Sequence, residues 1–133
     1  MKLSDDERTA VVVYRLQKAK ETLSEAEGTI KMCYWHTAAN RLYYACYYAA
    51  SALLIKNGFT AQTHQGVIHL LGLHFVKTGK ISKELGRFYS DIFELRQTGD
   101  YSDMIPIDEP EVKPMLEPAK SFIAEIERLI NEN

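Results

Sequence analysis

The chain has 133 residues, of which 46% are hydrophobic and 26% are charged, as is typical of one globular domain, here expected over residues 1–133. Its formal net charge of −2 excludes a basic surface over the whole molecule, so any RNA contact would need a local patch. Cys33 and Cys46 lack CxxC or zinc-ligand spacing, and the N-terminus lacks the apolar core of a signal peptide. These features predict reduced thiols in a cytoplasmic protein.

The first helix is expected to begin at Ser4, because Ser4 and Glu7 have the spacing of a capping box. Apolar residues then recur in steps of three and four from Val12 to Ala26, which predicts one buried face. Gly28 is expected to end this helix. We expect it to serve packing alone.

The second helix is the stretch around which the chain is organised, from Cys33 to Ile55. It has no proline or glycine, and it is apolar nearly all round, which predicts a helix buried among others. Its unbroken apolar run from Leu42 to Ile55 is shorter than the ~20 residues that span a bilayer, so a membrane helix is not expected. Its many tyrosines combine apolar rings with polar tips, so one face is expected to contact a second subunit in a homodimer.

Three further helices follow. Thr60 or Thr63 can cap one that runs to about residue 80, and Ser82 can cap another that ends near Tyr101. The last helix is expected to begin at Asp108, but Pro114 and Pro118 predict a kinked or delayed start. The fold class expected from these elements is all-α.

A metal site is not expected. The histidines at 64, 69 and 74 are spaced five apart, so they do not align on one helical face. No HExxH or similar spacing occurs in the sequence, and no cofactor is expected.

Three segments give the chain a resemblance to the HEPN domain family: NRLYYACYYAASALL at 40–54, THQGVIHLLGLHFVKTG at 63–79 and ELRQTGDY at 94–101. The resemblance implies an up-and-down four-helix bundle with an additional helix, usually paired as a homodimer. It also implies a possible nucleotidyltransferase partner protein in a toxin–antitoxin-like pair.

Many members of that family are metal-independent ribonucleases with an arginine followed, after four to six residues, by a histidine. By this resemblance Arg96 is the motif arginine, but Tyr101 stands in the place of the histidine, next to Asp100. A tyrosine with a pKa near 10 is a poor proton-transfer group at neutral pH. A histidine from another helix, His64 or His74, is a substitute only by default. In some pairs the partner transfers AMP to a tyrosine beyond the motif, but that position is Asp103 here.

Three functions remain open. The preferred one is a dimeric module that binds nucleotide or RNA, with weak or no catalysis, through Arg96, Asp100, Tyr101 and Arg41. The alternative is an endoribonuclease toxin with a degenerate motif. The third is a purely structural role, in which Arg96, Asp100 and Arg41 tie helices together. If Arg41 lies within the bundle, we expect it to pair with an acidic residue of the fourth helix or its end (Asp91, Glu94 or Asp100). We expect Arg96 to point near the bundle surface.

Overall fold

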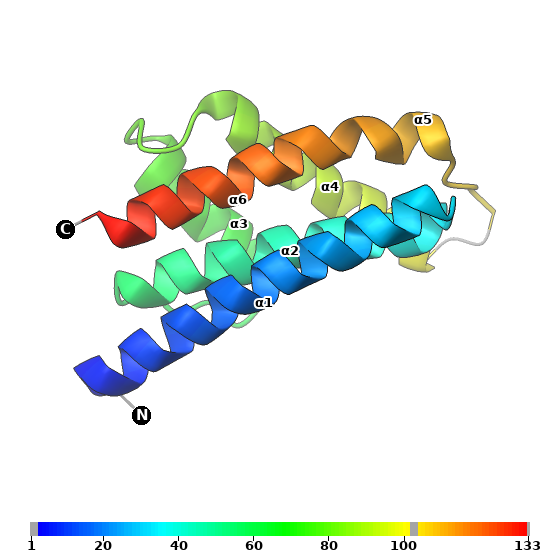
Figure 1. Ribbon diagram of the computed structural model, residues 1–133. Coiled ribbons are helices and arrows are strands. Elements are labelled where there is room, and N and C mark those ends of the chain that lie inside the picture. Colours follow the sequence, from blue (N-terminus) through cyan, green and yellow to red (C-terminus); the bar gives the residue numbers. More distant parts are fainter. Residues whose placement is uncertain (1–2, 102–103, 133) are drawn as a thin grey trace.

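The protein is a bundle of four long helices that run alternately up and down (Figure 1). The structure is a computed structural model that describes residues 3–101 and 104–132, and these residues form helices and no strands. The four bundle helices are α1 (Asp5–Lys31), α2 (Trp35–Lys56), α4 (Lys83–Tyr101) and α6 (Leu116–Asn131). The expected all-α bundle is therefore confirmed.

The additional helix lies between α2 and α4 in the chain. It consists of α3 (His64–Leu71) and a π-helical continuation, Gly72–Val76. Thr63 caps α3, because its hydroxyl accepts a hydrogen bond from the Gly66 N–H at 2.9 Å. This cap sets the position at which α3 starts beside α2.

The predicted helix starts agree with the structure at both ends of the chain. Ser4 and Glu7 form a capping box, in which the Ser4 N–H donates to the Glu7 carboxylate at 2.9 Å and the Glu7 N–H donates to the Ser4 hydroxyl at 3.2 Å. Near the C-terminus, the short helix α5 (Glu109–Val112) and a 3₁₀ turn, Lys113–Met115, precede α6. The expected delayed start at Pro114 is confirmed, since an interior proline cannot continue regular α-helical hydrogen bonding.

Helix α2 supplies the centre of the hydrophobic core. It packs against α1, α4 and α6, and its buried residues include six alanines: Ala38, Ala39, Ala45, Ala49, Ala50 and Ala52. Small side chains let neighbouring helices approach α2 closely, while many of the large apolar groups come from the partner helices. No helix within the described ranges is long and apolar enough to cross a bilayer.

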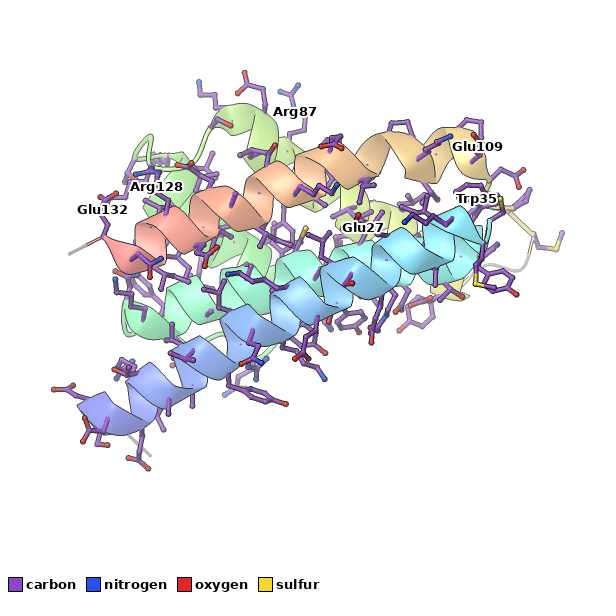
Figure 2. The ribbon with its side chains drawn as sticks, viewed as in Figure 1. Glu27, Trp35, Arg87, Glu109, Arg128 and Glu132 are labelled. Carbon is purple, nitrogen blue, oxygen red and sulfur yellow. The ribbon has the colours of Figure 1, made fainter. Side chains whose placement is uncertain are left out.

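Charged residues lie mostly outside this core. Figure 2 shows Arg87 of α4, Glu109 of α5 and Arg128 of α6 projecting outward from the bundle, and all three are exposed. Arg96 differs from them because it is buried on α4 with only 5% of its surface exposed. The burial of a charged residue is costly unless its polar atoms are compensated, so the groups around Arg96 decide what it can do.

Candidate functional site

A cleft of about 330 Å³ opens where α2, α3 and α4 meet. Its walls carry aromatic, amide and cationic groups from all three helices and from the cap of α3. The lining residues are Tyr44, Thr63, His64, Gln65, Phe93, Arg96, Gln97 and Tyr101. Two of the four residues predicted for the site, Arg96 and Tyr101, therefore lie in one cleft.

Arg96 lies deep in this cleft rather than near the bundle surface, so the expected surface position was wrong. Its guanidinium carbon lies 4.8 Å from the ring centre of Tyr43, 5.5 Å from that of Tyr44 and 5.7 Å from that of Phe93. Such cation–π contacts hold the charge among apolar rings. The periodicity of α4 explains the burial, because Arg96 follows the buried residues Ile92 and Phe93 on the inward face.

One carboxylate partly balances this buried charge. Asp100, one turn later on α4, accepts a hydrogen bond from Nη1 of Arg96 at 3.3 Å and from the side-chain amide of Asn40 at 3.5 Å. The ion pair is asymmetric in burial, since the side chain of Arg96 is 6% exposed and that of Asp100 is 35% exposed. Among the described residues, the buried Nε of Arg96 has no hydrogen-bond partner. A guanidinium in this state retains donor capacity that a ligand can use.

Arg41 is not among the residues that line the cleft, and its expected pairing with Asp91, Glu94 or Asp100 was wrong. Its Nη1 donates to Glu25 of α1 at 3.2 Å, and its Nη2 donates to the side-chain oxygen of Asn40 at 2.8 Å. The helical turn places Arg41 toward α1, away from the acidic groups of α4. Asn40 nevertheless links the two arginines, because its amide nitrogen donates to Asp100.

Tyr101 stands at the mouth of the cleft, with 77% of its surface exposed. It ends α4, and the preceding turn contains Gly99. A later part of the chain packs against this turn, since the side chain of Ile107 occupies the place that a Cβ at Gly99 would take. Tyr101 is therefore an open ring beside the cleft and does not reproduce a buried catalytic histidine. Asp103, the position beyond the motif, lies outside the described residues.

His64 is the residue that sequence reasoning ranked too low. It lines the cleft together with Arg96, and its Nδ1 lies 2.6 Å from the hydroxyl of Tyr43. His74, the other substitute, stacks on Phe59 with ring centres 4.1 Å apart and is absent from the cleft lining. The only sequence signal for His64 was its place directly after the Thr63 cap, which by itself indicates no chemistry.

Burial shifts the pKa values of both groups in this pair. Burial raises the pKa of Tyr43 well above its ordinary value, so the hydroxyl keeps its proton at neutral pH. The pKa of His64 is lowered, first by burial and second by the positive charge of Arg96. The cleft thus combines one permanent cation with an imidazole whose uncharged form is favoured.

The described residues contain no group of three or more histidine, cysteine, aspartate or glutamate side chains that could hold a metal ion. The arrangement of Arg96 and His64 can bind an anion by charge and by hydrogen bonds. The uncharged imidazole also provides ring nitrogens that can accept or donate a hydrogen bond.

Comparisons with known proteins agree with this architecture. The profile of the HEPN domain matches residues 12–129. A UPF0332 protein of Thermotoga maritima is 40% identical over 127 residues, which are 96% of each chain. A Methanocaldococcus jannaschii protein named "Putative toxin MJ0605" is 32% identical over 117 residues, which are 88% of this chain and 87% of that protein. The crystal structure of TT1696 from Thermus thermophilus has a TM-score of 0.76 and 18% identity, and the match covers 89% of this chain and 97% of that one.

Proposed function

This chain belongs to the HEPN domain family, and from that premise we propose that it is a dimeric cytoplasmic module that binds a nucleotide or RNA phosphate in the Arg96 cleft. The observation that carries the proposal is the incomplete pairing of Arg96. Its charge is buried against three aromatic rings and one partly exposed carboxylate, and its Nε has no partner among the described residues. A phosphate oxygen in the cleft can bind the guanidinium that lines it, because arginine binds phosphate through planar, charge-assisted hydrogen bonds.

The overall charge of the protein does not attract nucleic acid, so binding depends on this local site. A net charge of −2 provides no long-range attraction for a polyanion. A contact made by few cations should therefore show a shallow dependence on salt concentration. The proposal is for a module of modest affinity, with weak or no catalysis.

The test is RNA binding by wild type and by Arg96→Ala, measured by fluorescence anisotropy with a labelled single-stranded RNA in EDTA. Arg87→Ala is the matched control, because it removes the same charge from an exposed position of the same helix. We expect Arg96→Ala to weaken binding and Arg87→Ala to leave it unchanged. Equal affinities in all three proteins would overturn the proposal.

We place the homodimer contact on the tyrosine-bearing side of α2 and the adjoining face of α1. Tyr14 is 63% exposed on α1, and Tyr47 and Tyr48 of α2 are half-buried. Exposed apolar groups of this size support a protein contact. Light scattering at micromolar concentration should give twice the 15.2 kDa of one chain, and a monomer alone would contradict the assignment.

A nucleotidyltransferase partner is the second protein that we propose for this module. The relative named as a toxin supports a role in a toxin–antitoxin-like pair. Co-expression with a nucleotidyltransferase encoded in the neighbouring gene should give a complex that co-purifies. The absence of any such neighbour, or of co-purification, would remove this part of the proposal.

The second candidate function is a metal-independent endoribonuclease, and the position of His64 is what favours it. An imidazole in the Arg96 cleft can supply the proton-transfer group that Tyr101 cannot. In such a reaction the 2′-hydroxyl loses its proton and attacks phosphorus, and the 5′-oxygen leaves with a proton. Cleavage of RNA by wild type in EDTA, lost in Arg96→Ala, would establish this function in place of binding alone.

A further inference from the structure

His64 is held in one orientation by its neighbours. The Tyr43 hydroxyl bonds to Nδ1 at 2.6 Å, and the ring centre of Tyr47 lies 4.8 Å from that of His64. Tyr44 meets the imidazole edge-on at 5.8 Å. With Nδ1 engaged, Nε2 is the nitrogen left for another partner, and it makes no hydrogen bond to any residue in the described ranges. An oriented ring with one vacant nitrogen can bind a ligand through that nitrogen.

Tyr43 connects this histidine to Arg96. The ring of Tyr43 is fully buried, with the guanidinium of Arg96 4.8 Å from its centre and the imidazole of His64 5.5 Å from it. A single side chain therefore fixes the separation of the two groups. Burial raises the pKa of the Tyr43 hydroxyl, which therefore keeps its proton at neutral pH and lies 2.6 Å from Nδ1 of His64.

We propose that His64, positioned by Tyr43, is the second ligand-contacting residue of the cleft, and that with Arg96 it holds one sugar–phosphate unit of a single-stranded RNA. This rests on the proposed function and adds to it the class of nucleic acid. Arg96 takes the phosphate, and Nε2 of His64 takes the adjacent 2′-hydroxyl. A ring nitrogen can donate to or accept from a hydroxyl, and the 2′-hydroxyl is the group that distinguishes RNA from DNA.

The size and lining of the cleft favour a single strand. A volume of about 330 Å³ is near the lower end of the ~300–1,000 Å³ of small-ligand sites, so it suits one nucleotide. The exposed ring of Tyr101 stands at the mouth, where an unpaired base can stack. The amide side chains of Gln65 and Gln97 add hydrogen-bonding groups along the walls.

The experiment measures the affinity of the full chain for a labelled single-stranded RNA and for DNA of the same sequence, at one salt concentration in EDTA. We expect His64→Ala to weaken RNA binding roughly tenfold and to change DNA binding little, as for the loss of one hydrogen bond in a polar site. His74→Ala is the matched control and should change neither, because His74 lies outside the cleft. Tyr43→Phe keeps the ring and removes the hydroxyl, so it should weaken RNA binding about threefold.

Two further measurements distinguish the loss of a ligand contact from a folding defect in the variants. In the wild type, added RNA should shift the ring ¹⁵N resonances of His64 and leave those of His74 in place. In Tyr43→Phe without ligand, the His64 ring resonances should also shift, which a purely packing role of Tyr43 would not produce. His64→Gln serves as a second variant that retains a polar side chain if the alanine variant unfolds.

The outcomes separate the two proposals. If Arg96→Ala weakens RNA binding and His64→Ala behaves like His74→Ala, the role of His64 is overturned and the phosphate site stands. Loss of RNA and DNA binding to the same extent in His64→Ala would overturn the 2′-hydroxyl contact. Tighter binding of duplex than of single-stranded RNA would overturn the single-strand assignment. If Arg96→Ala changes nothing, the proposed function itself fails.

Discussion

Arg41 and Arg96 lie in neighbouring parts of the bundle, and their surroundings differ in a way that separates a packing role from a binding role. The side chain of Arg41 is 30% exposed, and its donors reach Glu25 and the Asn40 amide oxygen. The side chain of Arg96 is 6% exposed, has one carboxylate, and keeps an unpartnered Nε within the described residues. A structural arginine completes its bonds within the protein, whereas a ligand-binding arginine keeps donors in reserve.

The largest expected effect is on RNA affinity. Arg96→Ala should weaken binding at least tenfold, since a hydrogen bond to a charged group contributes about 1.5–3 kcal/mol. Arg41→Ala should weaken it far less, because Arg41 does not line the cleft and its donors already bond to Glu25 and Asn40. Anisotropy titrations of the two variants under identical salt test the contrast. Similar losses for both would show that the two arginines form one binding surface.

The next effect concerns the carboxylate beside Arg96. Asp100→Ala leaves a nearly buried guanidinium without its ion-pair partner, and should lower the free energy of unfolding by about 1–2 kcal/mol. Asp91→Ala is the control, because Asp91 is exposed on the same helix. Urea denaturation followed by circular dichroism gives both values. A loss in Asp100→Ala no larger than in the control would mean that the aromatic rings alone stabilise Arg96.

A smaller effect is expected at the other arginine. Arg41→Met removes an ion pair with Glu25, whose side chain is 60% exposed, and should cost less than about 1 kcal/mol. If the ion pair of Arg41 were instead buried between helices, the free energy of unfolding would fall by on the order of 3 kcal/mol, as for a broken buried ion pair. The melting temperature of the variant decides between these values.

The smallest effect is a pH dependence of stability from His64. Its folded-state pKa is lowered by burial and by Arg96, so the unfolded chain binds more protons as the pH falls below the ordinary value of 6.5. Stability from this group is therefore complete above that pH and is lost as the pH falls toward the folded pKa. His64→Gln should flatten this part of a stability–pH profile. An unchanged profile would show that His64 titrates alike in both states.

The sequence by itself determined where most helices begin, because these signals are local, but the end expected at Gly28 was wrong, since α1 continues to Lys31. The capping box at Ser4, the uninterrupted apolar stretch of α2 and the proline at 114 act through neighbouring residues, and each agrees with the observed structure. Simple spacing also placed Arg96, Asp100 and Tyr101 on one helix end. Only the tertiary structure decided which side chains share a cleft. His64 meets Arg96 across the ring of Tyr43, and Arg41 turns toward Glu25, because helix packing brings together residues whose separation in the chain carries no signal.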